Sequence, residues 1–382
     1  MSIHPRSHQE LSDSEQALVL EVLRHGPLSR SRLAARLGLS APTLTRLSAP
    51  LVEAGLLTET GLLREARTGR PSRPLDIVPD AAHFVGVKLT GDEAHAVLTD
   101  LRAGLRGHGR LPLTDTDPAA VAGVVADLVG QLSSGLGEVC ALGVSVGGDA
   151  ADHRTVGRAP FLDWYDVPLA RLLEEATGLP TVLDNDLVAL TRAEHWFGKA
   201  RRSDHFAVIT IGAGTGYGLV VHDQVVESPD TGVGLIGHFP LEGQGPVCRE
   251  GHHGCAATVL TIPAISAAVS EAMDRPVGYS ECLELAAGGH PLAGPVIRVA
   301  ARGLGGLVAA VCNIAMCTDV VLTGEGIGLA EVARADLEEG LRRGRDPRAS
   351  EVHLEVQHLD FSQWARGAAV CAIQRWVVHP SR

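Results

Sequence analysis

Two groups of hydroxyl and arginine side chains stand close together near the N-terminus. The first contains Thr43, Thr45 and Arg46. The second is a basic run with a single acid among its arginines, which are Arg64, Arg67, Arg70 and Arg73. A guanidinium group bonds the O6 and N7 atoms of guanine bidentately, and hydroxyl groups bond bases or phosphates. The first group is therefore a candidate for contacts to base edges, and the second for contacts to phosphates or the minor groove.

Three short helices are predicted to position the first group. Each follows a serine cap and ends at a glycine; the caps are Ser12, Ser29 and Ser40, and the glycines are Gly26, Gly38 and Gly55. Two short helices joined by a glycine-containing turn form a helix-turn-helix, whose second helix lies in the major groove. Pro50 leaves open whether the third helix kinks there or breaks after Arg46. We expect DNA contacts from Ser29, Arg32, Ser40, Thr43, Thr45 and Arg46.

A hairpin is predicted after these helices. Its strands fall at residues 56–58 and 75–78, and the basic run lies in the Gly/Pro-rich segment between them. A basic hairpin tip after three helices is typical of a winged helix, and it would place Arg67, Arg70 and Arg73 near phosphates. The pattern predicts a DNA-binding domain over residues 1–78. The alternative is a three-helix protein-interaction module with a solvated basic loop.

The charge of the chain is divided unevenly. The net charge is −12, yet residues 1–75 hold ten arginines and seven acidic residues, for +3. The remainder holds 23 basic and 38 acidic residues, for −15. We therefore expect only the N-terminal part to meet double-stranded DNA, while the acidic remainder is repelled from it.

The cysteines and apolar runs indicate the compartment. Seven cysteines without a secretory leader favour reduced thiols or metal ligands over disulfides. The apolar run at residues 304–317 is short and interrupted by Asn313, so it predicts a buried helix and not a membrane span. We expect a cytoplasmic protein with no membrane partner.

Strands alternate with helices from about residue 83 onwards. Strands are predicted at residues 85–87, 94–98, 141–146, 182–183 and 206–211, and helices at residues 118–132 and 169–176. This alternation predicts an α/β fold.

Six tracts of this part, in order, resemble the ROK family of repressors, open reading frames and sugar kinases, and Gly69-Arg70-Pro71 resembles a run in the wing of its repressor branch. The six tracts are Leu142 to Gly147, Asp184 to Asp186, Gly212 to Gly216, Gly237-His238 with Cys248 to Cys255, Leu322 to Gly326, and Arg366 to Ala369. The resemblance implies a winged helix-turn-helix followed, over residues 79–382, by a two-lobed actin/hexokinase-like domain with a cleft near residues 185–240. It also implies a homodimer or homotetramer, for which an inverted-repeat operator is expected.

The tract that corresponds to the first phosphate motif of the family departs from it. The motif runs Asp-x-Gly-Gly-Thr, whereas this chain has Lys88 to Asp92, so that a lysine replaces the acid. Phosphoryl transfer needs Mg²⁺, which a cation cannot hold, so we expect no catalysis and no catalytic residue. Asp186 stands at the position of the family's base, and we expect it to pair with Lys88 because a buried lysine needs a partner.

Two sugar-binding carboxylates of the family are replaced as well, by Leu235 and Ala257. Neither replacement can accept hydrogen bonds from sugar hydroxyls. A small-molecule effector is therefore not necessarily a sugar: a less polar or an anionic one fits better, unless the pocket has lost its ligand. The candidate effector-binding residues are Lys88, Asn185, Asp186, Leu235 and His238.

The resemblance also implies a structural zinc site of one histidine and three cysteines. His238, Cys248 and Cys255 match this set, and Glu250 stands in place of the middle cysteine. Zinc accepts carboxylate oxygen, so these four residues are the predicted ligands, with a histidine at 252–253 as the alternative fourth. The other interpretation is a metal-free loop with two buried thiols.

The favoured function is a sequence-specific DNA-binding regulator, a repressor, with a degenerate ROK domain that senses an effector. One alternative is an active sugar kinase with an accessory DNA-binding domain. Another is a regulator that is controlled by a protein partner or is independent of any ligand.

Overall fold

The computed structural model describes residues 11–61, 73–134, 138–243 and 245–378. The chain divides into two compact units. The first contains residues 1–189 and 364–382, and the second contains residues 190–363. Each unit is described by itself.

A winged helix-turn-helix forms the N-terminal part of the first unit. Its elements are α1 (Asp13–His25), α2 (Arg30–Leu37), α3 (Ala41–Glu53) and the antiparallel strands β1 (Leu57–Glu59) and β2 (Leu75–Ile77). Ser12, Ser29 and Ser40 cap the three helices, as predicted. The third helix does not break after Arg46 but continues through Pro50 to Glu53. Leucines from every helix fill a common core, so packing among the elements holds the domain together.

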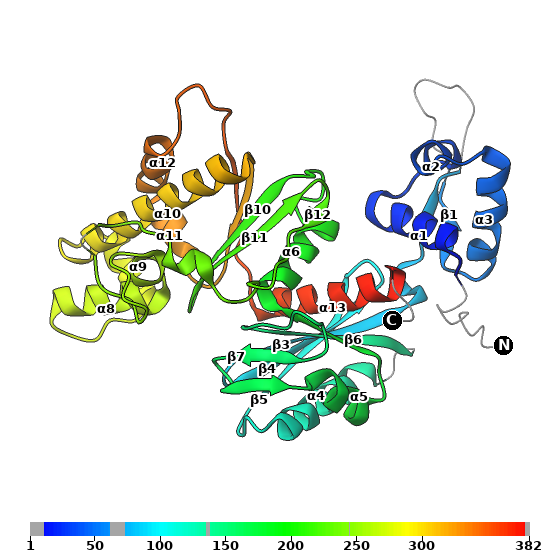
Figure 1. Cartoon of the computed structure of the whole chain (residues 1–382), viewed down its shortest axis with the longest axis horizontal. Coiled ribbons are helices and arrows are strands. Elements are labelled where there is room, and N and C mark those ends of the chain that lie inside the picture. Colours follow the sequence, from blue (N-terminus) through cyan, green and yellow to red (C-terminus); the bar gives the residue numbers. More distant parts are fainter. Residues whose placement is uncertain (1–10, 62–72, 135–137, 244, 379–382) are drawn as a thin grey trace. The chain divides into compact units, whose positions relative to one another are not determined.

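A five-stranded sheet follows in the first unit (Figure 1). Its order is β5-β4-β3-β6-β9, in which β3, β6 and β9 are parallel and β4 and β5 are antiparallel. The strands are β3 (His83–Leu89), β4 (Glu93–Asp100), β5 (Leu105–Pro112), β6 (Val139–Val146) and β9 (Thr181–Asn185). Helices α4 (Pro118–Ser133) and α5 (Leu169–Thr177) cover one face, and α13 (Phe361–Val378) lies on the other (Figure 1). A hairpin of β7 (Val156–Ala159) and β8 (Trp164–Val167) and the 3₁₀ turn η2 (Pro79–Ala81) complete the unit.

Glycines let α13 approach this sheet closely. A Cβ atom on Gly86 of β3 would lie 2.1 Å from the Ala365 carbonyl oxygen, and one on Gly143 of β6 would lie 1.9 Å from the Ala368 carbonyl oxygen. Both positions therefore require glycine. Because neither glycine has a side chain, the backbone of α13 lies directly on the backbone of the sheet.

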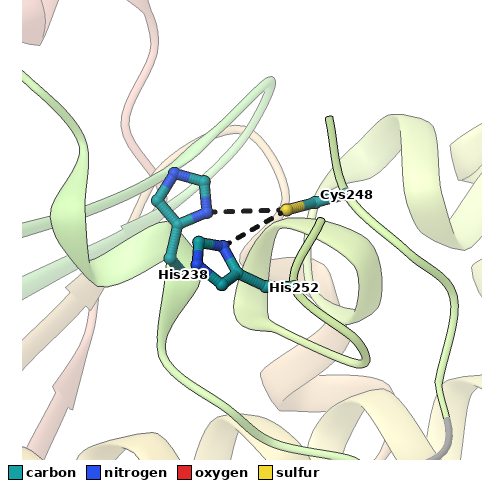
Figure 2. Close-up of side chains that lie close together, drawn as sticks. All are labelled: His238, Cys248 and His252. Carbon is teal, nitrogen blue, oxygen red and sulfur yellow. Dashed lines mark hydrogen bonds between the residues drawn. The ribbon is translucent and has the colours of Figure 1, made fainter. Parts of the chain in front are cut away.

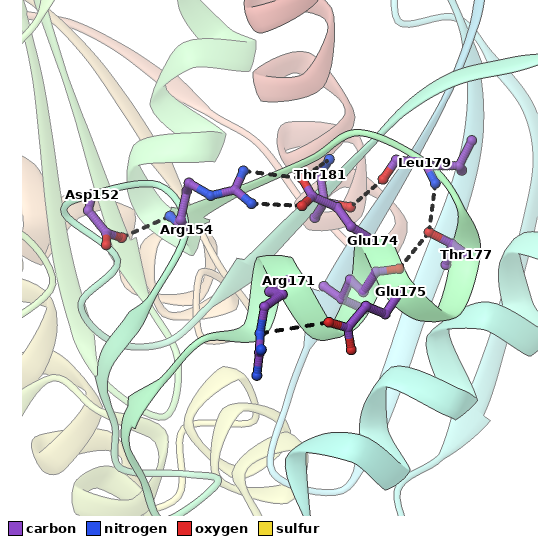
Figure 3. A network of polar contacts seen from close by, with 9 residues as sticks. Asp152, Arg154, Arg171, Glu174, Glu175, Thr177, Leu179 and Thr181 are labelled. Carbon is purple, nitrogen blue, oxygen red and sulfur yellow. Dashed lines mark hydrogen bonds and ion pairs between the residues drawn. The ribbon is translucent and has the colours of Figure 1, made fainter. Parts of the chain in front are cut away.

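Polar contacts tie α5 to the neighbouring loops (Figure 3). Arg154 donates two hydrogen bonds to the Glu174 carboxylate, at 3.1 and 2.7 Å. The same carboxylate accepts the backbone N–H of Thr181 at 3.3 Å, at the start of β9. The two arginine bonds hold the pKa of Glu174 below its ordinary value. This network fixes the start of the strand that leads to residues 184–186.

The second unit is built on a sheet with the same topology. Its order is β12-β11-β10-β13-β14, again with two antiparallel strands at one side and parallel pairing at the other. The strands are β10 (Phe206–Ile211), β11 (Thr215–Val221), β12 (Gln224–Val225), β13 (Asp319–Thr323) and β14 (His353–Val356). The helices are α7 (Ala256–Val259), α8 (Ile262–Met273), α9 (Tyr279–Ala287), α10 (Ala293–Ala315), α11 (Gly328–Val332), α12 (Arg334–Arg343) and the 3₁₀ turn η3 (Leu235–His238). Helix α6 (Asp186–Phe197) begins in the first unit and ends in the second.

Helix α10 is the central helix of the second core. Leu304, Leu307 and Val308 are fully buried in it, which confirms the buried helix predicted for the apolar run. Among the described residues, α10 alone has the length and apolar composition that a membrane-crossing helix needs, and 56% of its apolar window is buried inside the protein. Burial of this kind is typical of a core helix in a globular domain.

Candidate functional site

The recognition helix α3 presents its N-terminal side chains outward. Thr45 and Arg46 are exposed, whereas Leu44 and Leu51 are buried on the opposite face. Thr43 is half-buried, and its hydroxyl shares a 2.8 Å hydrogen bond with that of Ser40. The helical period therefore separates a core face from an outward face that carries a guanidinium and hydroxyl groups.

The other predicted DNA-contacting residues differ in their exposure. Arg32, Ser40 and Arg73 are exposed. Ser29 is only 3% exposed, and its hydroxyl accepts the Arg32 N–H at 3.4 Å to cap α2. This burial does not support the prediction that the Ser29 side chain contacts DNA. The predicted contacts of Arg67 and Arg70 lie outside the described residues.

Arg30, a basic residue beside β1 that was not among the predicted DNA contacts, also lies near the wing. Arg30 at the start of α2 donates a 2.8 Å hydrogen bond to Glu59 of β1, and Arg73 lies 3.6 Å from the same carboxylate. The Arg30 hydrogen bond, with the two nearby positive charges, holds the pKa of Glu59 below its ordinary value. Glu59 therefore stays ionised and gathers two arginines at the base of the wing.

The predicted ion pair between Lys88 and Asp186 is confirmed. Lys88 Nζ, on β3, bonds Asp186 Oδ2 at the start of α6, and their side chains are only 8% and 20% exposed. The Trp364 ring of α13 lies 5.7 Å from the ammonium, within range of a cation–π interaction. The pair satisfies both charges, so the place where a Mg²⁺-binding acid is expected holds a cation instead.

Asn185, another predicted effector-binding residue, is engaged within the fold. It is 7% exposed, and its Nδ2 donates to the Gly148 carbonyl at 2.8 Å. Its Oδ1 accepts the N–H groups of Leu187 and Val188, at 3.0 and 3.2 Å. Asn185 therefore caps α6 and joins it to the end of β6, which also orients Asp186.

Leu235 and His238 belong to η3 in the second unit. The Leu235 side chain is 60% exposed, and a leucine there offers no hydrogen-bond acceptor to a sugar hydroxyl. An effector pocket shared by these two residues with Lys88 and Asp186 of the first unit stays a prediction.

A turn in the second unit brings three possible metal ligands together: His238, Cys248 and His252 (Figure 2). The Cys248 N–H donates to the His252 carbonyl at 2.9 Å, and the Gly251 N–H donates to the Cys248 carbonyl at 3.0 Å. Gly251 takes a φ of +87°, which glycine adopts without strain. The turn therefore aims the first and last of its side chains in the same direction, toward His238.

The spacing within this group suits a tetrahedral metal. Cys248 Sγ lies 3.5 Å from His252 Nδ1 and 3.8 Å from His238 Nδ1. Zinc bonds of about 2.3 Å to sulfur and about 2.0 Å to nitrogen, at the tetrahedral angle, separate such atoms by about 3.5 Å. The donor set of two imidazoles and one thiolate therefore fits zinc.

The two remaining predicted ligands differ from this group. Glu250 lies next to it: its carboxylate is 3.9 Å from His238 Nε2, and a hydrogen bond from the Cys248 thiol holds its pKa below the ordinary value. Cys255 is fully buried, with the Thr258 hydroxyl 3.9 Å from its sulfur. The structure groups His252 with the predicted pair His238 and Cys248, and it leaves both Glu250 and Cys255 outside this group of three.

The family model named ROK matches residues 84–375, and the chain therefore belongs to the ROK family. The repeated sheet topology of the two units agrees with the actin/hexokinase-like fold that this family implies.

Similar curated proteins are regulators. The chain is 27% identical over 320 residues to the Escherichia coli DNA-binding transcriptional dual regulator NagC, covering 79% of this chain and 78% of that one. It is 22% identical over 364 residues to the Escherichia coli DNA-binding transcriptional repressor Mlc, covering 91% and 89%. It is 22% identical over 279 residues to the xylose repressor of Bacillus subtilis, covering 72% of each chain.

Solved structures with the same fold include regulators and kinases. A ROK family transcriptional regulator, described as a homologue of the Escherichia coli Mlc protein, superimposes with a TM-score of 0.81 at 22% identity, covering 96% of this chain and 98% of that one. The ROK hexokinase of Thermus thermophilus gives a TM-score of 0.64 at 26% identity, covering 75% and 97%. Since the regulator match extends over 96% of this chain, the winged helix falls within the shared architecture.

Proposed function

We propose that the protein is a sequence-specific DNA-binding transcriptional regulator that acts as a repressor. The observation that carries this proposal is α3, which exposes Thr45 and Arg46 on the face opposite its buried leucines, beside a two-stranded wing. Recognition helices enter the major groove with such N-terminal side chains. The curated relatives that are named as DNA-binding regulators support the same reading.

The ROK domain of this proposal is not an enzyme. Lys88 occupies the position of the family's magnesium-binding acid and neutralises Asp186, the residue at the position of the base. Such a domain retains the fold of a kinase as a sensor and a dimerisation platform. The proposal includes a cytoplasmic homodimer or homotetramer and an effector that lacks the hydroxyl pattern of a simple hexose.

A structural Zn²⁺ ion is part of the proposal. His238, Cys248 and His252 would hold it, and the nearby carboxylate of Glu250 would turn toward the ion as the fourth ligand. When bound, zinc would fix the turn at residues 248–252 against η3, because each ligand loses its freedom to move. Metal analysis of protein purified without a histidine tag tests this point, with one zinc per chain expected.

The DNA-binding proposal is tested with a duplex that the full-length protein selects from a random-sequence pool. Changing Arg46→Ala should cost about 1–3 kcal/mol of binding free energy and relax the base preference at one position of each half-site. The exposed Arg110→Ala on β5 is the matched control, since it removes the same charge away from the winged helix. Equal affinity and unchanged preference in Arg46→Ala would remove α3 from the mechanism.

A further inference from the structure

The first ROK lobe is the part of the first unit that consists of the sheet β5-β4-β3-β6-β9 and its helices, and one of its turns contacts the winged helix. Arg102, between β4 and β5, pairs with Asp76 of the wing strand β2. The same guanidinium lies 3.4 Å from the carbonyl oxygen of Val22, near the end of α1. The side chains of Arg102 and Asp76 are 27% and 24% exposed, so the ion pair is largely shielded from water.

Arg102 contacts the winged helix at the place where the end of α1 meets strand β2. The Gly26 N–H bonds the Val22 carbonyl at 2.8 Å to close α1, and two bonds of 3.0 and 2.8 Å join Leu28 to Leu75, next to Asp76. A Cβ atom on Gly26 would lie 2.4 Å from Val22 O and 3.1 Å from Asp76 Oδ1. Glycine therefore lets the helix end and the acid approach together, and a cation at that end also complements the helix dipole.

The turn that carries Arg102 is itself fixed to the lobe. Asp100 accepts the N–H groups of Arg102 and Gly104, each at 2.8 Å. Arg366 of α13 donates a 2.8 Å hydrogen bond to the carbonyl of Ala103, which holds a left-handed φ of +55°. The guanidinium of Arg102 is thus presented by a turn that is anchored both to the sheet and to α13.

We propose that Arg102 is a positioning residue for DNA binding: it fixes the orientation of the winged helix on the first ROK lobe through Asp76 and Val22. The inference rests on the proposed function. Charge-assisted contacts from one guanidinium to a carboxylate on β2 and to a carbonyl near the end of α1 set an orientation, whereas a flexible linker alone does not. An inverted-repeat operator needs two winged helices at a set spacing, so loss of this contact weakens binding to two half-sites more than binding to one.

The test compares the affinities of the full-length protein for two DNA duplexes. One is the duplex that the wild type selects from a random pool, and the other has one half-site scrambled. Arg102→Ala should lose about tenfold in affinity for the two-site duplex while its Kd for the one-site duplex changes by less than about twofold. Arg102→Lys, which keeps the charge but not the planar guanidinium, should show an intermediate loss, and Arg110→Ala should match the wild type at both duplexes.

Binding to the one-site duplex shows that the winged helix of each variant is folded. An Arg102→Ala protein that keeps the full preference for two half-sites overturns the inference, as does an equal loss on both duplexes, which would mark Arg102 as an ordinary phosphate contact. A wild type without a two-site preference also overturns it. Failure of the wild type to bind any duplex would instead overturn the proposed function.

Discussion

At the scale of residues, the Lys88–Asp186 ion pair is the observation on which the proposed loss of kinase activity rests. Both side chains are largely buried, so each charge depends on the other for its solvation. Removing one partner of such a pair leaves the other charge buried and uncompensated, whereas removing both does not.

Lys88→Met should therefore lower the free energy of unfolding by about 2–4 kcal/mol, and the double variant Lys88→Met/Asp186→Asn should recover much of that loss. The other lysine of the chain, Lys199, is the matched control: its contact with Glu355 is exposed, so Lys199→Ala should leave the urea midpoint unchanged. If Lys88→Met and Lys199→Ala both changed the free energy of unfolding by the same small amount, the buried pair would contribute nothing to stability.

At the scale of elements, α13 packs closely against the first sheet. The contact of Gly143 with the Ala368 carbonyl leaves no space for a side chain. Gly130 on α4 is exposed, and a Cβ atom added there would have open space around it.

Gly143→Ala should lower the thermal midpoint, because overpacking at a tight backbone contact costs about 1–3 kcal/mol or more. Gly130→Ala should instead raise stability by about 0.5–1 kcal/mol, since alanine has less backbone freedom to lose in a helix. Calorimetry of the two proteins measures the difference, and a Gly143→Ala protein as stable as the wild type would contradict the close packing of α13.

The sequence predicted the elements with local signals and missed those that depend on distant contacts. Serine caps and closing glycines gave the helices of the winged helix, and the motif order gave the ROK fold with the Lys88–Asp186 pair. The hydrogen bond from Arg366 to Ala103 joins residues 263 positions apart, so no local sequence pattern predicts it. The choice of His252 over Cys255 in the metal group likewise depends on how a turn folds, which spacing alone does not decide.

At the scale of the whole molecule, a domain with a kinase fold follows a DNA-binding domain. A regulator and an active sugar kinase built in this way would differ in whether they phosphorylate sugars. With glucose, N-acetylglucosamine or xylose in the presence of ATP and Mg²⁺, we expect no sugar-dependent release of ADP. A coupled assay checks this, with an active ROK hexokinase as the positive control. Turnover in the ordinary range of about 1–100 s⁻¹ would establish the kinase reading instead.

The ammonium of Lys88 has a further consequence for the molecule as a regulator. A metal ion or a nucleotide comes and goes with its concentration, but a charge that belongs to the polypeptide is present at one equivalent in every copy. The electrostatics at this position are therefore the same in a starved cell and in a growing one. A regulator built in this way keeps a positive charge at this position without needing a bound metal ion there.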